Sequence, residues 1–270
     1  FTGDIRKRAG LVLIFTSAIT LGSGGSAGRE GPIALIGASA GSAIGKAIRL
    51  SARDLKVLTC CGVASGIAAT FNAPMGGAIF SMEVISKKFT SLDAVPILLA
   101  AVVGKAVATE LIDPVPEFVN PNFYFTTFDM VLCFFIGPLF GFLSFLWVKG
   151  YYFFEDRFQD LPLPDILKPA VGGLTAGVCG IFFFEFGIMG VGYEGINNIF
   201  MLAARAPATD LLLLLLALGL LKMLATSSTV GSGGSGGVFA PTLYIGTMFG
   251  LAAGMLAEIL APDQIANPLD

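Results

Sequence analysis

The feature that most constrains the fold is a glycine-serine motif that occurs twice. The first copy begins at Gly22 (GSGGSAGREGP) and the second at Gly231 (GSGGSGGVFAP). After a shift of 209 positions (231 − 22), 12 of the 24 residues from Gly22 to Gly45 are identical to their counterparts. The sequence therefore predicts an internal duplication. Low glycine-serine complexity does not explain the later matches, in which Pro32, Ile36, Gly37, Gly41 and Gly45 align with Pro241, Ile245, Gly246, Gly250 and Gly254.

Each copy reads as a glycine loop followed by a proline that opens an apolar helix. Proline is tolerated in the first helical turn because the N–H that it lacks has no helical partner there. Small residues four apart form a face that another helix can approach closely. A helix N-terminus offers unpaired amides and partial positive charge, and glycines let a ligand reach the backbone. Two such ends at matching places in two halves predict an anion site inside a membrane.

Composition indicates an integral membrane protein in the lipid bilayer. The chain is 55% hydrophobic and 13% charged, whereas soluble domains are about 25% charged. The net charge is −3, and the strongly basic surface that nucleic-acid binding requires is not indicated, so no nucleic-acid partner is expected. The chain has no histidine, and its four cysteines lie in apolar runs without metal spacing. We therefore expect no metal and no cofactor. Serine-histidine catalysis is excluded and no other set of catalytic polar residues is apparent, so we expect that the protein is not an enzyme.

The apolar runs predict an all-α, polytopic fold of about ten helical segments of uneven length. An asparagine-proline corner at Asn72–Pro74 separates two short segments, which predicts broken, re-entrant helices buried in protein. Residues 1–112 read as part of a first half and residues 128–270 as part of a second half of one incomplete domain. The predicted segments cover residues 9–21, 32–48, 57–70, 75–85, 94–112, 130–154, 169–188, a short helix up to 204, 211–226 and 239–260, with polar connectors at 113–127 and 155–168 and a polar end at 262–263.

Three motifs resemble signatures of the CLC family of chloride channels and chloride/proton antiporters. Gly28–Pro32 matches GREGP, Gly237–Pro241 matches GxFxP, and Phe71–Pro74 matches the segment after the first signature, with Glu83 nine residues later. The resemblance covers essentially the whole chain, which would be the middle portion of the membrane domain. It implies two inverted halves per subunit, a homodimer with one pore in each subunit, and a place in the cell (inner) membrane.

The resemblance also implies roles for individual residues. Glu30 would be the gating glutamate of a voltage-gated chloride pathway, whose carboxylate competes with the anion. The transported ion would be chloride, with protons as a second transported ion in an antiporter. The anion-binding backbone would comprise Arg29, Glu30, Gly31, Val238, Phe239 and Ala240.

One departure bears on proton coupling. Exchangers of the family usually carry a proton-transfer glutamate one residue after the position of Glu83, and here that residue is Val84. The pair Glu83–Val84 therefore favours a channel. The alternative is a chloride/proton antiporter whose inner proton route uses water or Glu83, and a fluoride-exporting relative is a third possibility.

Purely structural interpretations of these residues are also possible. Glu30 alone would read as a helix-capping carboxylate, but an ionisable group deep in a membrane costs about 2.5–3.5 kcal/mol or more, which favours a functional role. Glu83 reads as structural, bonded to a broken helix end, and Arg29 as orienting its loop. Lys105 and Lys222 would snorkel or pair with acids. The spacing Gly231-x-Gly233-x-x-Gly236 also fits a dinucleotide fingerprint, yet a leucine-rich helix precedes it instead of a strand.

Overall fold

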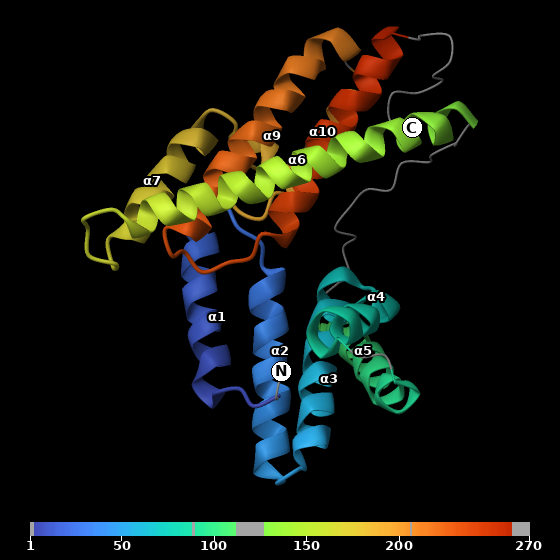
Figure 1. Ribbon diagram of the computed structural model, residues 1–270, viewed down its shortest axis with the longest axis vertical. Coiled ribbons are helices and arrows are strands. Elements are labelled where there is room, and N and C mark those ends of the chain that lie inside the picture. The colour runs from blue at the N-terminus through green and yellow to red at the C-terminus, as the bar shows by residue number, and fades with distance from the viewer. Residues whose placement is uncertain (1–2, 88–89, 112–126, 206, 261–270) are drawn as a thin grey trace. The chain divides into compact units, whose positions relative to one another are not determined.

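The computed structural model describes residues 3–87, 90–111, 127–205 and 207–260 (Figure 1). Within these ranges the chain is helical and forms no named strand, which confirms the all-α prediction. A π-helix, η1 (Ser81–Ser86), and a 3-10 turn, η2 (Phe184–Phe186), interrupt the α-helices. The α-helices are α1 (Lys7–Gly22), α2 (Glu30–Ala47), α3 (Ala52–Phe71), α4 (Pro74–Phe80), α5 (Ser91–Leu111), α6 (Thr127–Gln159), α7 (Lys168–Ile181), α8 (Tyr193–Ala203), α9 (Ala208–Gly231) and α10 (Phe239–Leu260).

Five of the described helices are long and apolar enough to cross a membrane: α3, α5, α6, α9 and α10. At 1.5 Å per residue a span of about 30 Å needs about 20 residues. The seven-residue α4 and the eleven-residue α8 are too short for this. Helices long enough to span are thus interspersed with shorter ones, as the sequence predicted for a polytopic protein with broken and re-entrant segments.

The helices fall into two compact units. Unit 1 comprises Phe1–Ile19 and Arg29–Glu117, and unit 2 comprises Thr20–Gly28 and Phe118–Asp270. The first glycine loop therefore belongs to the same unit as the second. The predicted connector 113–127, apart from its last residue, and the predicted polar end 262–263 lie outside the described residues.

In unit 1, α2 and α3 lie side by side (Figure 1). Their backbones approach closely, because a Cβ built on Gly62 would lie 2.0 Å from the carbonyl oxygen of Gly37, and one on Gly41 would lie 2.4 Å from that of Leu58. This confirms the predicted small-residue face in the first repeat. In the second repeat, a Cβ on Gly246 or Gly250 would have no described neighbour within 4 Å, so there the predicted helix contact is not observed among the described residues.

The corner predicted at Asn72–Pro74 is present. Asn72 caps α3 in the left-handed region with φ of 53°, Ala73 N–H donates to Ala68 O at 3.2 Å, and Pro74 begins α4. The single helix expected over 75–85 is wrong, however, because α4 gives way to η1 at Ser81. The wider π turn buries two consecutive residues, Ser81 and Met82, and Ser81 Oγ donates to Cys60 O of α3 at 2.7 Å.

Unit 2 is built around α9, which contacts α6, α7 and α10. In Figure 1 the long α6 crosses α9 and α10. Trp147 Nε1 of α6 donates to Thr242 Oγ1 of α10 at 3.2 Å, and a Cβ on Gly172 of α7 would lie 2.3 Å from Ser228 O of α9. The helix expected over 169–188 is too long, since α7 ends at Ile181 and a turn-rich segment follows.

Candidate functional site

The two copies of the motif pair with each other inside unit 2. Gly28 N–H donates to Gly237 O at 2.6 Å, and Gly237 N–H donates to Gly28 O at 2.7 Å, as an isolated antiparallel bridge. The two glycines are equivalent under the 209-residue shift (237 − 28). Equivalent residues that exchange both hydrogen bonds are related by a local two-fold axis, which is the arrangement expected of an inverted repeat.

A second pair of hydrogen bonds follows the same symmetry. Ser26 N–H donates to Thr229 Oγ1 at 3.1 Å, and Ser235 N–H donates to Thr20 Oγ1 at 3.1 Å. Both the serines and the threonines are 209 positions apart (235 − 26 and 229 − 20). Each loop is therefore tied to the threonine that precedes the other loop. The sequence analysis missed these threonines, although the repeat shift extended by two residues toward the N-terminus aligns them.

Each loop also bends in the same way. Gly24 and Gly233 have φ of 91° and 100°, values that only glycine adopts readily. The next residues close equivalent turns, with Gly25 N–H bonded to Thr20 O at 2.9 Å and Gly234 N–H bonded to Thr229 O at 3.0 Å. The glycines are thus required by backbone geometry, and both loops deliver the chain into a helix.

The helices begin at equivalent positions. In unit 1, α2 starts at Glu30 and Ile33 N–H donates to Arg29 O at 3.0 Å. In unit 2, α10 starts at Phe239 and Thr242 N–H donates to Val238 O at 2.9 Å. Pro32 and Pro241 each stand in the first turn, as predicted. The first amides of both helices point away from their own helices and make each start suited to negative charge.

The predicted gating residue lies at one of these starts. Glu30 is the first residue of α2 and only 3% of its surface is exposed. Its neighbours on the chain, Arg29 and Gly31, are half-buried and exposed, respectively. A carboxylate in the first turn is stabilised by the helix dipole, so Glu30 occupies a position that also suits a bound anion.

The corresponding residues of unit 2 form a more open helix start. Val238 and Phe239 are 38% and 45% exposed, whereas Ala240 is buried. An apolar residue, Phe239, therefore stands in the second repeat where Glu30 stands in the first. Only the first of the two helix starts carries an ionisable side chain that can compete with an anion.

Glu83 and Val84 are neighbours on η1 and both are exposed. Among the described residues, Glu83 makes no ion pair and no hydrogen bond to a helix end, so the structural role expected for it is not observed. Nothing in the described part of unit 1 restrains its carboxylate.

The sequence analysis also missed a polar face on α9. Lys222, Thr226 and Thr229 follow one another at spacings of four and three residues and are 0%, 0% and 3% exposed. Thr226 Oγ1 is 2.9 Å from Ser26 Oγ, and Thr229 Oγ1 accepts from Ser26 N–H. Lys222 neither snorkels nor pairs with an acid among the described residues, contrary to the sequence-based expectation. Its Nζ instead donates to backbone carbonyls of the segment that follows α7.

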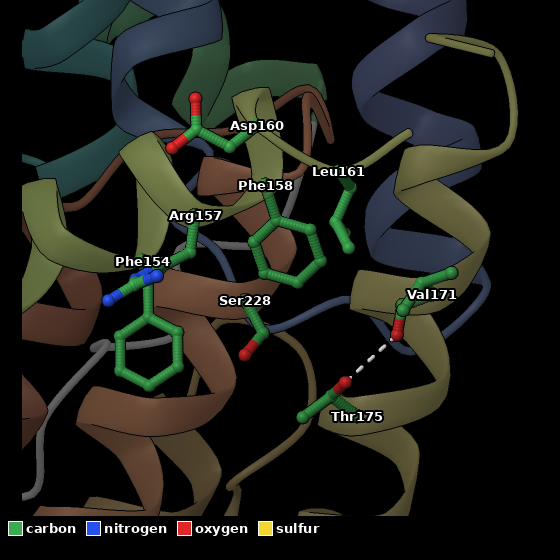
Figure 2. A pocket seen from close by; sticks show the side chains of 8 residues that line it. All are labelled: Phe154, Arg157, Phe158, Asp160, Leu161, Val171, Thr175 and Ser228. Carbon is green, nitrogen blue, oxygen red and sulfur yellow. Dashed lines mark hydrogen bonds between the residues drawn. The ribbon is translucent and has the colours of Figure 1, made fainter. Parts of the chain in front are cut away.

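Unit 2 also contains a groove of about 450 Å³ between the end of α6, α7 and α9 (Figure 2). Most of its wall is apolar, with Phe154, Phe158 and Leu161 on one side. Polar groups come from Arg157, Asp160, Thr175 and Ser228, and Thr175 Oγ1 donates to Val171 O at 2.9 Å. None of the predicted site residues lines this groove, so it is distinct from the glycine loops.

Taken together, the spans, the broken helices and the symmetric glycine loops define an integral membrane protein with an inverted repeat, an architecture of channels and transporters. A family model described as "Voltage gated chloride channel" matches residues 1–269. The chain belongs to this family, which consists of channels and transporters and not of enzymes, as the sequence analysis expected.

Individual relatives agree with this assignment. A putative chloride channel protein, ClcB-like, from Ralstonia nicotianae is 31% identical over 272 residues, covering 99% of this chain and 62% of the relative. The crystal structure of a slow cyanobacterial Cl⁻/H⁺ antiporter is 25% identical with a TM-score of 0.81, covering 97% of this chain and 61% of that one.

A CLC-type fluoride/proton antiporter is 23% identical with a TM-score of 0.74 over 96% of this chain and 62% of its own, which shows a shared fold alone. The chain thus spans about three fifths of the length of each of these three proteins.

Proposed function

We propose that the full-length protein carries chloride, or a similar small anion, across the bilayer. The proposal is supported by two glycine loops of one design, each of which leads into the start of a helix, where the first amides have no acceptor within the helix itself. Helix N-termini bind anions through these amides and the helix dipole. The ligands that we assign are the backbone groups of Arg29–Gly31 and Val238–Ala240. This chemistry requires no cofactor, since the transported ion is the only ligand, with protons added in an antiporter.

We assign the gate to Glu30, and one observation carries this assignment. Glu30 is a buried carboxylate at the first position of α2, where its charge is placed as an anion would be. An ionised Glu30 competes with chloride for the same donors. Protonation removes the charge, releases the side chain from the amides and opens the path to the anion.

Between a channel and an antiporter, we favour channel-like conduction. Val84 carries no ionisable group at the position where exchangers of the family usually have a proton-transfer glutamate. The alternative, chloride/proton antiport with Glu83 or water on the inner proton route, is supported by the antiporter structure that is 25% identical to this chain. A fluoride-exporting activity, the third possibility, has only the shared fold in its favour.

We further propose a homodimer in the cell (inner) membrane, opened by voltage. Much apolar surface of α5 and α6 is exposed, for example Leu92 at 78% and Phe134 at 76%. Such surface is suited to lipid or to a second subunit. Cross-linking of the full-length protein in its own membrane tests the dimer, and a single monomeric band would contradict it.

Chloride flux from liposomes tests the gate. The full-length wild-type protein and Glu30→Gln are compared at about pH 4.5 and about pH 7.5. Glu110→Gln, which replaces an exposed acid at the end of α5, serves as the control. We expect wild type and Glu110→Gln to conduct better in acid. Glu30→Gln should conduct similarly at both pH values, because its neutral side chain does not compete with chloride.

Two outcomes would count against the proposal. Absence of anion flux from the wild-type protein would contradict the function itself. An unchanged pH dependence in Glu30→Gln would leave anion transport standing but remove Glu30 as its gate.

A further inference from the structure

Lys222 has an unusual position for a charged residue. It lies in the middle of the spanning helix α9, and its side chain is fully buried at 0% exposure. Burying a charge in a membrane protein is costly unless other groups take over the role of water, so such a residue is a functional candidate by default. The described residues of unit 2 place no carboxylate in an ion pair with it.

Backbone carbonyls replace water around the ammonium group. Lys222 Nζ donates to Gly187 O at 2.9 Å, Ile188 O at 3.1 Å and Gly190 O at 3.0 Å. An ammonium has three N–H donors, so all of them are used. The ring of Tyr244 lies with its centroid 5.1 Å from Nζ, within range of a cation–π contact. Tyr244 also donates its hydroxyl to Phe186 O at 2.6 Å, which holds the same segment from α10.

The segment held in this way, residues 186–190, reaches the first glycine loop. Gly190 O accepts from Lys222 and also from Ala27 N–H at 3.3 Å. Further along the same face of α9, Thr226 and Thr229 bind the hydroxyl and the N–H of Ser26. Three consecutive polar residues of one helix face therefore hold the stretch that ends two residues before Arg29.

This arrangement has no counterpart in the other repeat. The position equivalent to Lys222 is Leu13 (222 − 209), and the position equivalent to Thr226 is Ser17 (226 − 209). The duplication alone does not explain the lysine. The symmetric bonds of Thr20 and Thr229 already join the two glycine loops. Lys222 acts on the first glycine loop only, which it reaches through Gly190 O, and it brings a positive charge near that loop.

We propose that Lys222 is a positioning residue of the anion path, which holds the loop before Glu30 in place and lends its positive charge to anion binding. The proposal rests on the proposed anion transport. The charge has no acidic partner among the described residues of unit 2, and the carbonyls that surround it only partly screen it. At an effective dielectric constant of about 20, a unit charge that does not touch the anion still changes its binding constant by about tenfold.

Substitutions that separate charge from shape test the proposal in the full-length protein. Lys222→Arg keeps the charge, Lys222→Gln keeps two donors without the charge, and Lys222→Met keeps only the length and bulk. Lys105→Met, which removes a half-buried lysine from the span α5, serves as the control. Each variant is measured for chloride flux against chloride concentration in liposomes and for amide hydrogen exchange of residues 24–28 and 186–190.

We expect Lys222→Gln and Lys222→Met to need about tenfold more chloride for half-maximal flux, while Lys222→Arg and Lys105→Met stay within about twofold of wild type. Lys222→Met should also speed amide hydrogen exchange at least tenfold in residues 24–28 and in residues 186–190, because it removes three hydrogen bonds. If Lys222→Arg and Lys222→Gln needed the same chloride concentration for half-maximal flux, the role of the charge would be overturned. Unchanged exchange in Lys222→Met would overturn the positioning role. If that variant does not fold, Lys222→Gln, which loses one of the three N–H donors, must still speed exchange at residues 186–190, and unchanged exchange there would overturn it. If wild type moves no anion, the proposed function fails, and the exchange measurement still decides whether Lys222 positions the loop.

Discussion

At the scale of single residues, the paired threonines show how few groups align the two repeats. Thr20 and Thr229 each accept one N–H bond from the serine of the opposite loop. Thr229 Oγ1 also donates to Ala225 O at 2.9 Å, so its hydroxyl is oriented to accept from Ser26. A valine has the same shape but cannot accept, which leaves a loop amide without its partner.

We therefore expect Thr20→Val and Thr229→Val to lower the free energy of unfolding by similar amounts, about 1–3 kcal/mol each. Thermal unfolding of the full-length protein in detergent measures this. Thr247→Val is the control, because Thr247 Oγ1 donates to Leu243 O of its own helix, α10, at 2.9 Å in a bond that is exposed. A loss in one variant but not the other would contradict an equal role for the two threonines.

Sequence reasoning predicted the glycine loops and the first-turn prolines correctly because these features are local. The glycine loops and the prolines of the first turn follow from backbone geometry that a short stretch of sequence dictates. Lys222 was expected to snorkel or to pair with an acid, and this was wrong because its partners are carbonyls more than 30 residues away in the chain. No composition signal marks a backbone carbonyl as the partner of a lysine.

At the scale of helices, the contact of α2 with α3 depends on glycine at both faces. A Cβ on Gly62 would lie 2.0 Å from Gly37 O, which is backbone and cannot rotate away. We expect Gly62→Ala to cost about 3 kcal/mol, the upper end of the usual range for overpacking. Gly141→Ala in α6 is the matched control, since a Cβ there meets nothing within 4 Å among the described residues.

Alanine should be neutral at Gly141 or stabilise the helix by up to about 1 kcal/mol. Denaturation curves of the two variants in the same detergent give the comparison. If Gly62→Ala were as stable as Gly141→Ala, α2 and α3 would have to separate at little cost, and the close contact would not be the source of the stability of unit 1.

Helix boundaries show a similar limit of sequence reasoning. The corner at Asn72–Pro74 was predicted, because asparagine and proline act through their own backbone angles. The π turn at Ser81 was missed, since the bond from Ser81 Oγ to Cys60 O is a contact between helices. The early end of α7 was missed for the same reason, because the carbonyls after it bind Lys222 of a distant helix.

At the scale of the whole molecule, the repeat is symmetric in backbone and asymmetric in chemistry. The loops pair through equivalent glycines and through equivalent serine–threonine bonds. Among the described residues, however, only the first repeat carries an acid at its helix start and only the second carries a buried lysine. Duplication explains why two helix starts of one design exist. In the function proposed above, divergence of single side chains gives competition with the anion to Glu30 and support of its loop to Lys222.

Proton coupling is the property that separates the two versions of the proposed function. With the full-length protein in liposomes under a chloride gradient, chloride efflux and external pH are recorded together. We expect chloride efflux without steady uphill proton movement, because Val84 has no group that can carry a proton inward from the position after Glu83. Glu83→Gln should then leave the flux unchanged. Steady proton pumping would instead make the protein an antiporter. Its loss in Glu83→Gln would identify Glu83 as the inner proton acid, whereas its persistence would point to water or another acid on that route.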